Sequence, residues 1–536
     1  MKPQIRFQLA GRWTVRPLLT CLLASILAIA GTFESAVGAD APPREAPFIL
    51  TPPAPPQPRI NGPLVYGVRP GSPFLYRIPC TGQRPIAFSA RHLPAGLTLD
   101  AQRGIITGSL AKAGTNRVTL FARNALGQAR REFRIIAGNT LALTPPMGWN
   151  SWYIHYDRVS DALMRQAADQ MIASGMADFG YQYVNIDDCW MKKQGDEPYR
   201  DPAATLVPNR RFPDMKGLAD YIHGQGLKAG LYTSPGPWTC GGYTGAYQHE
   251  TQDALTFANW GFDFLKYDWC SYGEIFNHGD PRLTNTVSRS TAAGLAGYQF
   301  PYQLMRDRLR QQHRDLVLNL CQYGMADVWQ WGGEVGNSWR TTGDLGLERS
   351  THLPGFYSVG FSNAKHWEYA RPGAWNDPDY LLIGWVGDAN QMGEGKQTDL
   401  TPNEQYSYLS MWSLMAAPLI FSGDMAKLDA FTLNLLCNSE VIAVDQDPLG
   451  RQAKILRQTD AEFVLVKELE DGSRAIGLFN LGEQPARLAV SWAELGLSGR
   501  QHVRDLWRQE NCGIAKGQYE TTVPRHGVTL VRLSPK

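Results

Sequence analysis

Charged side chains close several apolar segments in the central part of the chain. In chain order they are Asp187 and Asp188 in "YQYVNIDD", Lys266 and Asp268 in "FDFLKYDWC", and Arg340 and Asp344 in "SWRTTGD". Two uncharged polar side chains, Tyr232 in "GLYTS" and Gln322 in "LNLCQYG", lie in similar positions. Burying a carboxylate is costly unless the group is paired or does chemistry. One of these residues alone could be a helix cap or a loop bond, but the whole set indicates a site for a polar ligand.

Asp268 and Asp344 have different neighbours, which is the arrangement that glycoside cleavage requires. Lys266, Asp268 and Cys270 are spaced by two, so in a strand they point the same way. The Lys266 cation favours the ionised carboxylate that a nucleophile needs, although a purely structural ion pair is the alternative. Asp344 follows Arg340 by four residues and would have to arrive protonated. One carboxyl would then attack the anomeric carbon while the other protonates the leaving oxygen.

These side chains must be positioned by the strands that they close. Eight short apolar runs alternate with amphipathic helical segments, near residues 146–149, 181–187, 227–234, 262–268, 316–322, 338–344, 373–377 and 419–424. The alternation predicts a parallel α/β fold, and its extent of about 300 residues predicts a (β/α)8 TIM barrel with the active site where the strands end. A doubly wound open sheet is the alternative, but no Gly-rich phosphate loop follows the first strand.

Helix signals lie between these strands. The helical pattern of residues 160–175 ends near Gly175, and that of residues 213–224 ends at Gly224. The segment from Thr401 has Pro402 at its first helical position and Glu404 placed to complete a capping box, and it stops at Pro418.

The remaining segments indicate a multidomain protein. Residues 1–39 have a basic start and a short apolar run, and predict a signal peptide that is cleaved before Asp40 rather than an uncleaved anchor. Residues 40–58 predict a Pro-rich linker, and residues 59–140 predict an Ig-like β-sandwich that serves as a spacer rather than a glycan-binding module. With the barrel at 141–448, residues 449–536 predict a C-terminal antiparallel β-sandwich.

Composition limits the partners. The 52 Lys and Arg residues nearly balance the 50 Asp and Glu residues. We therefore expect no binding of nucleic acid, and no insertion into a membrane after the signal peptide is cleaved. A neutral carbohydrate is the natural substrate class, and Trp 16 supplies platforms for sugar faces, although Trp is also common in cores. One of the eight Cys, Cys21, lies in the predicted signal peptide. An odd number of Cys therefore remains in a chain that is expected to be exported to the periplasm or secreted.

Six ordered motifs closely resemble glycoside hydrolase family 27, the α-galactosidases and α-N-acetylgalactosaminidases. They are "TPPMGWNSW", "YVNIDDCW", "RFPDMKGLADYIHGQGLKAGLY", "FLKYDWC", "SWRTTGD" and "PGAWNDPDYLLIG". The resemblance covers roughly residues 141–536 and implies a (β/α)8 barrel followed by an antiparallel β-domain. Residues 93–127 are similar to the Ig-like domains of bacterial cell-surface and secreted proteins.

The resemblance also implies roles for individual residues. Asp268 in "KYD" matches the nucleophile and Asp344 in "WRxxxD" matches the acid/base. Trp149 matches the aromatic residue that packs on the sugar. The other implied sugar contacts are Asp187 and Asp188 for the 4- and 6-hydroxyls, Lys266 and Arg340 as further ligands, and Tyr232 in the pocket wall.

The cysteines follow the family only in part. Cys240 and Cys270 match the disulfide beside the nucleophile. Cys189 and Cys321 match half-cystines whose partners are replaced by Ile154 and Gly336, so both are expected to be buried thiols. The pairing of Cys80, Cys437 and Cys512 stays open.

Gln322 departs from the family, many of whose α-galactosidases have Glu at this position, facing the sugar 2-position. Gln can still bond a 2-hydroxyl, and the bulky pair Gln322-Tyr323 argues against an α-N-acetylgalactosaminidase. β-L-arabinopyranosidase and isomalto-dextranase activities stay open, with terminal α-galactoside the leading substrate because Asp187 and Asp188 are both retained.

Other function classes fit less well. A non-catalytic glycan receptor predicts the loss of one carboxylate, and both are present. The 10 His show no H-E-x-x-H or paired-His spacing, so we expect no metal, and without a nucleotide loop or reactive C-x-x-C we expect no cofactor. Retention of configuration would require the Asp268 and Asp344 carboxyls to lie about 5 to 5.5 Å apart.

Overall fold

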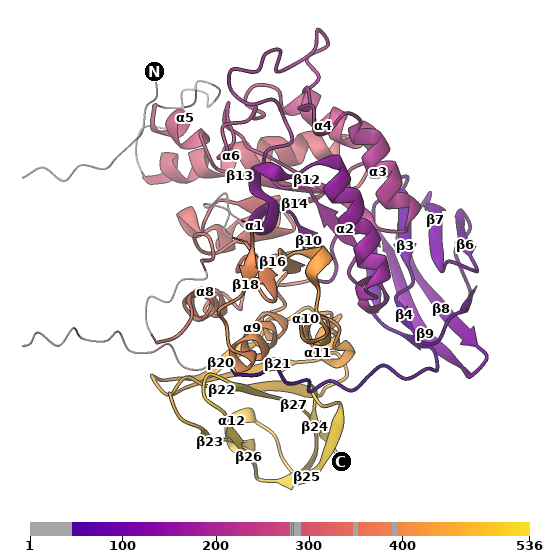
Figure 1. Ribbon diagram of the computed structural model, residues 1–536, viewed down its shortest axis with the longest axis vertical. Coiled ribbons are helices and arrows are strands. Elements are labelled where there is room, and N and C mark those ends of the chain that lie inside the picture. Colours follow the sequence, from indigo (N-terminus) through magenta and orange to yellow (C-terminus); the bar gives the residue numbers. More distant parts are fainter. Residues whose placement is uncertain (1–44, 279, 281, 283–290, 347–351, 388–393) are drawn as a thin grey trace, which may run out of the picture. The chain divides into compact units, whose positions relative to one another are not determined.

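The computed structural model describes residues 45–278, 280, 282, 291–346, 352–387 and 394–536 (Figure 1). The expected signal peptide at 1–39 and residues 40–44 of the linker lie outside the described residues. None of the described helices combines the length and the apolar character that a membrane crossing needs.

Eight parallel strands form the central sheet and confirm the predicted barrel. Their order is β16-β15-β14-β13-β12-β11-β10-β19, with β10 (Met147–Asn150), β11 (Tyr183–Asn185), β12 (Lys228–Thr233), β13 (Phe264–Asp268), β14 (Val317–Cys321), β15 (Ser338–Arg340), β16 (Trp375–Asp377) and β19 (Leu419–Phe421). Leu381, just beyond β16, pairs in parallel with Phe421 of β19 and joins the two edges of the sheet. Each predicted strand is present, although most are shorter than the sequence pattern indicated.

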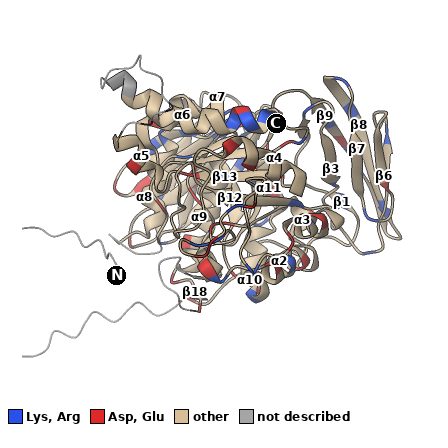
Figure 2. Cartoon of the chain, turned by 90° about the horizontal axis from the view of Figure 1, so that it is seen from above, with Lys and Arg blue, Asp and Glu red and all other residues tan. Residues whose placement is uncertain are grey.

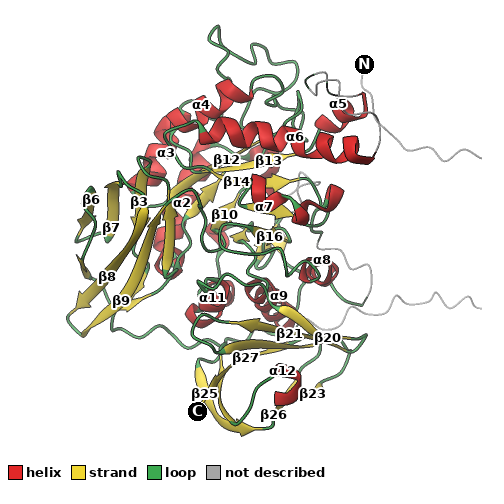
Figure 3. Cartoon of the chain, turned by 180° about the vertical axis from the view of Figure 1, so that it is seen from behind, coloured by secondary structure: helices red, strands yellow, loops and turns green. Residues whose placement is uncertain are grey.

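Helices wrap the strands (Figure 3). They are α1 (Trp152–His155), η1 (Tyr156–Arg158), α2 (Asp161–Ala173), η2 (Met176–Phe179), α3 (Met215–Gly224), α4 (Glu250–Trp260), α5 (Tyr272–His278), α6 (Thr291–Arg310), η3 (Met325–Gln330), α7 (Gly332–Val335), α8 (Gly355–Ala364), α9 (Pro402–Leu414), η4 (Met425–Lys427), α10 (Ala430–Leu436) and α11 (Ser439–Asp445), and β17 (Trp385–Val386) pairs with β18 (Lys396–Gln397). The capping box of Thr401 and Glu404 is present. α9 ends at Leu414 rather than at Pro418, because Ala416 takes a left-handed conformation with φ +50.

The N-terminal domain is a β-sandwich with its own core. One sheet has the order β2-β9-β8-β5, the other β3-β7-β6, and β1 pairs with β4. The strands are β1 (Arg59–Ile60), β2 (Val65–Val68), β3 (Pro73–Arg77), β4 (Cys80–Thr81), β5 (Ala87–Arg91), β6 (Leu97–Asp100), β7 (Ile105–Ser109), β8 (Gly114–Asn124) and β9 (Gly127–Ala137).

This sandwich contacts the barrel where the barrel strands begin. Arg69 Nε donates to Asp315 at 2.6 Å, and Arg69 also reaches the carbonyls of Arg310 and Gln312. Lys228, the first residue of β12, lies 5.0 Å from the ring centre of Tyr66. Because catalytic residues of such barrels lie at the opposite strand ends, the sandwich leaves the predicted active face open.

Residues 45–58 lack helix and strand and lie along the barrel helices. Tyr406 in α9 donates its hydroxyl to Phe48 O at 3.0 Å, and Asn434 in α10 donates to Thr51 O at 2.8 Å. The described part of the Pro-rich segment is therefore held against the barrel rather than hanging free.

The C-terminal domain packs on α9. Its main sheet has the order β20-β21-β22-β27-β24-β25, and β23 pairs with β26. The elements are β20 (Lys454–Gln458), β21 (Glu462–Glu468), β22 (Arg474–Asn480), β23 (Ala486–Ser491), α12 (Trp492–Leu495), β24 (Arg500–Asp505), β25 (Glu510–Lys516), β26 (Gln518–Val523) and β27 (Val528–Pro535). Basic and acidic residues are interspersed along the described elements (Figure 2).

Candidate active site

The residues singled out from the sequence lie at or just beyond the ends of the barrel strands. Trp149 is in β10, Tyr232 in β12, Lys266 and Asp268 in β13, and Arg340 in β15, while Asp187 and Asp188 follow β11, Gln322 follows β14 and Asp344 follows β15. All of them except Asp344 are buried. Parallel strands of a closed barrel all end on one face, so these side chains gather at one mouth.

Asp268 is held by two tyrosine hydroxyls. Tyr232 donates to Oδ2 at 3.1 Å, and Tyr323 donates to Oδ1 at 2.6 Å. Burial raises the pKa of Asp268 to about 6, although the Lys266 charge and the Tyr323 hydrogen bond act in the opposite direction. At neutral pH the carboxyl is therefore mostly ionised, as a nucleophile must be.

Lys266 pairs with Asp187 rather than with Asp268. Its Nζ donates to Asp187 Oδ2 at 2.9 Å, and the same oxygen accepts from Asn150 Nδ2 and the Tyr380 hydroxyl at 2.9 and 3.1 Å. Burial alone would lower the pKa of Lys266, but the neighbouring acidic groups, Asp187 first, raise it well above its usual value. The cation is fixed between strands β11 and β13 and acts on Asp268 through space.

Asp188 is bonded to the backbone. Its Oδ1 accepts from Cys189 N at 2.6 Å and its Oδ2 from Gly241 N at 2.7 Å. Burial raises the pKa of Asp188 to about 7. The two neighbouring carboxyls therefore have different surroundings, because Asp187 faces a lysine and Asp188 faces backbone amides.

Trp149 and Gln322 are fully buried. The Trp149 indole is oriented by its Nε1, which donates to Gly423 O at 2.8 Å. Neither the amide oxygen nor the amide nitrogen of Gln322 has a hydrogen-bond partner among the described residues. An unpaired buried amide costs about 1 to 3 kcal/mol, so a ligand hydroxyl that bonds it removes that penalty.

Arg340 joins Asp344 to Asp379. Its Nη1 contacts Asp344 Oδ1 at 3.2 Å and its Nη2 contacts Asp379 Oδ2 at 3.0 Å. The Asp344 side chain is 60% exposed, whereas that of Asp379 is almost completely buried. Asp344 thus stands at the mouth, where water and a leaving group have access, and the guanidinium sets its position.

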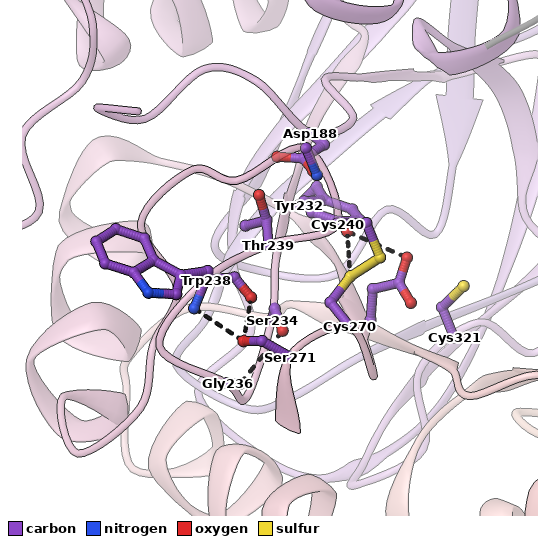
Figure 4. Close-up of a disulfide and its surroundings, with 12 residues drawn as sticks. Asp188, Tyr232, Ser234, Gly236, Trp238, Thr239, Cys240, Cys270, Ser271 and Cys321 are labelled. Atoms are coloured by element: carbon purple, nitrogen blue, oxygen red, sulfur yellow. Dashed lines mark hydrogen bonds between the residues drawn. A yellow bond between two sulfur atoms is a disulfide. The ribbon is translucent and has the colours of Figure 1, made fainter. Parts of the chain in front are cut away.

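A disulfide joins Cys240 to Cys270 beside the mouth (Figure 4). The Tyr232 hydroxyl lies 3.1 Å from Cys270 Sγ, so the bridge contacts a residue that bonds Asp268. Cys189 and Cys321 are buried and unpaired, and Cys80, Cys437 and Cys512 are also free.

Three further residues belong to this site. Asp379 accepts from the Tyr153 hydroxyl at 3.0 Å, Tyr380 bonds Asp187, and Tyr323 bonds Asp268. "WNDPDY" places Asp379 and Tyr380 just after the seventh strand, so the rule that strand-end polar residues face the mouth could have identified them. Tyr323 follows Gln322 directly, where the alternation of a strand would point it away from the site.

A possible metal-ligand group lies elsewhere. His352, Glu483 and His526 bring ligand atoms within 4.8 Å of one another. His526 Nδ1 and Nε2 lie 2.9 and 3.0 Å from the carboxyl oxygens of Glu404 and Glu483, so both ring nitrogens already contact a carboxyl group.

Comparisons with known proteins found family models and relatives that match most of the chain. Residues 144–447 match the family model described as "Alpha galactosidase A", residues 461–533 match its C-terminal β-sandwich domain, and residues 47–137 match an Ig domain model. α-Galactosidase 2 of Arabidopsis thaliana is 37% identical over 75% of this chain and 92% of its own.

Solved structures are similar as well. A candidate α-galactosidase from Bacteroides fragilis has a TM-score of 0.80 and 34% identity, over 91% of this chain and 99% of its own. A β-L-arabinopyranosidase from Geobacillus stearothermophilus has a TM-score of 0.62 and 26% identity, over 74% of this chain and 97% of its own.

Proposed function

The chain belongs to the α-galactosidase family, glycoside hydrolase family 27, and from that premise we propose that it is a retaining exo-α-galactosidase in which Asp268 is the nucleophile and Asp344 the acid/base. One observation carries this proposal. Asp268, buried and largely ionised, ends strand β13, the exposed Asp344 follows β15, and the Asp187–Asp188 pair follows β11 of the same barrel.

The mechanism is double displacement. An oxygen of Asp268 bonds the anomeric carbon as the bond to the aglycone oxygen breaks, and Asp344 gives that oxygen its proton. Asp344 then takes a proton from water, the water oxygen bonds the anomeric carbon, and the ester bond to Asp268 breaks. Two inversions release galactose with its original α configuration.

Specificity for galactose follows from the paired carboxyls. Galactose differs from glucose in its axial 4-hydroxyl, and Asp187 and Asp188 are the acceptors proposed for the 4- and 6-hydroxyls. Lys266 holds Asp187 in place, so a sugar with an equatorial 4-hydroxyl loses the hydrogen bond that we propose for the axial 4-hydroxyl. Trp149, Tyr232, Gln322 and Arg340 are the remaining proposed sugar contacts.

A β-L-arabinopyranosidase is the second candidate. The Geobacillus enzyme shares the fold, and β-L-arabinopyranose has the ring configuration of α-galactose without the 6-hydroxymethyl group. The two sugars differ only in this group.

Hydrolysis of a matched aryl glycoside panel tests the proposal. The panel contains the α-galactoside, β-L-arabinopyranoside, α-N-acetylgalactosaminide and α-glucoside, with an isomalto-oligosaccharide alongside. We expect the highest kcat/KM on the α-galactoside. A higher value on another member would reassign the substrate, and no hydrolysis of any would refute a glycosidase function.

Export is a separate proposal that rests on the basic and apolar pattern of residues 1–39. N-terminal sequencing of protein from the culture fluid and the cell envelope should begin at Asp40. An intact Met1 in mature protein would contradict cleavage.

A further inference from the structure

Tyr323 reaches Asp268 through an unusual backbone path. Tyr323 and Gly324 follow β14 with φ angles of +62 and +82, and Ala326 and Asp327 are also left-handed at +54 and +49. A Cβ on Gly324 would lie 2.4 Å from Thr341 O, so the turn is pressed against the segment that follows β15. A left-handed conformation at a non-glycine residue costs about 1 to 3 kcal/mol and often marks a functional site. Here it turns Tyr323, which strand alternation would direct away, back over the mouth.

The Tyr323 side chain contacts one proposed catalytic carboxyl and adjoins the arginine that contacts the other. Its hydroxyl donates to Asp268 Oδ1 at 2.6 Å, and the Arg340 guanidinium carbon is 6.0 Å from its ring centre. Arg340 in turn contacts Asp344 at 3.2 Å. Tyr323 therefore touches the nucleophile directly and adjoins the guanidinium that positions the acid/base.

The two oxygens of Asp268 are not held equally. Oδ1 has the 2.6 Å bond from Tyr323, while Oδ2 has the longer 3.1 Å bond from Tyr232, whose hydroxyl also contacts Cys270 Sγ. Burial first, and then the Asp268 charge, raise the pKa of Tyr323 well above its usual value. Tyr323 thus remains a donor throughout the working pH range.

We propose that Tyr323 is a positioning residue of the double displacement, one that holds Asp268 Oδ1 so that Oδ2 attacks the anomeric carbon. The inference rests on the proposed function and extends it. In the first step Oδ2 bonds the anomeric carbon and Asp268 loses its charge to the ester, so the hydrogen bond from Tyr323 weakens. In the second step water displaces Oδ2, the carboxylate charge returns, and Tyr323 stabilises it. The hydroxyl therefore favours breakdown of the glycosyl-enzyme over its formation.

Tyr323→Phe tests this assignment, because it keeps the ring and removes only the hydroxyl. With an activated aryl α-galactoside we expect kcat to fall about tenfold or more, since a hydrogen bond to a charged group is lost in the second step. KM should fall together with kcat because the glycosyl-enzyme accumulates, and intact-mass spectrometry of quenched enzyme should show the hexosyl adduct. The acid limb of kcat/KM should move to higher pH, because Asp268 loses a donor to its ionised form.

Tyr369→Phe is the matched control, a partly buried tyrosine packed against the barrel core, and its kinetics and melting temperature should equal those of wild type. An unchanged kcat, KM and acid limb in Tyr323→Phe would overturn the assignment. So would a lower kcat with an unchanged KM and an unmoved acid limb, which would indicate a merely structural tyrosine. A wild-type enzyme that hydrolyses no glycoside of the panel would instead refute the proposed function, so the two failures are distinguishable.

Discussion

Replacing Asp187 with Asn isolates the buried ion pair at the base of the site. Three donors converge on Asp187 Oδ2, from Lys266, Asn150 and Tyr380, and Asp188 N donates to Oδ1 at 2.9 Å. An amide has only one acceptor oxygen, so in either orientation its NH2 faces a donor. Lys266 also keeps its charge with its closest partner neutralised.

The magnitude follows from burial. The side chains of Lys266 and Asp187 are 9% and 1% exposed, so solvent screens the uncompensated charge only weakly. Breaking a buried pair on one side costs about 3 to 5 kcal/mol. For a domain of this size each kcal/mol lowers Tm by about 2 to 4 °C, so we expect Asp187→Asn to melt roughly 6 to 20 °C below wild type.

Differential scanning calorimetry on a double-mutant cycle measures the effect. Asp187→Asn combined with Lys266→Met removes the unpaired charge and should recover most of the lost stability, giving a clear coupling energy between the two sites. Asp196→Asn, at an exposed loop position, is the control and should stay within about 0.5 kcal/mol of wild type. A wild-type Tm for Asp187→Asn, or additive effects in the cycle, would refute the reasoning.

Three further predictions follow from the site and its supports. Asp268→Asn should abolish turnover with an unchanged Tm. The wild-type kcat/KM should fall as pH drops below about 6, because burial raises the pKa of Asp268 to about 6 and only the ionised form attacks. Full activity at pH 4 would contradict this. Cys240→Ser with Cys270→Ser opens a loop of 30 residues and should cost about 3 to 4 kcal/mol in chemical denaturation, so an unchanged midpoint would count against the bridge. Arg69→Ala removes the Asp315 contact of the N-terminal sandwich and should lower the free energy of unfolding by about 1 to 3 kcal/mol, with kcat/KM within twofold of wild type. The control Arg117→Ala, at an exposed strand position, should change neither quantity. A large loss of kcat/KM in Arg69→Ala would show that the sandwich affects catalysis.

The barrel could be predicted from the sequence because its strands are short apolar runs bounded by helix signals. The ends of the strands were less predictable. The sequence pattern extended the strands to Asp187 and Asp344, whereas the hydrogen-bonded strands β11 and β15 end two and four residues earlier. The rule that successive side chains point to opposite faces holds only inside a strand. It therefore placed Lys266 and Asp268 on one face but could not place Tyr323, whose backbone is left-handed.

Long-range pairing was also hidden from the sequence. Lys266 is two residues from Asp268 in the chain, yet its bonded partner is Asp187, 79 residues away. The contact forms because a single strand, β12, separates β11 from β13 in the sheet. The Pro-rich composition of residues 45–58 likewise indicated an extended segment but not its hydrogen bonds to Tyr406 and Asn434.

The most direct test of the central claim is the anomeric configuration of the first product. Proton NMR during hydrolysis of an aryl α-galactoside should show α-galactose first, with the β anomer appearing later by mutarotation. That result follows from attack by Asp268 and proton transfer by Asp344. β-Galactose as the first product would require a direct attack by water and would contradict the double displacement.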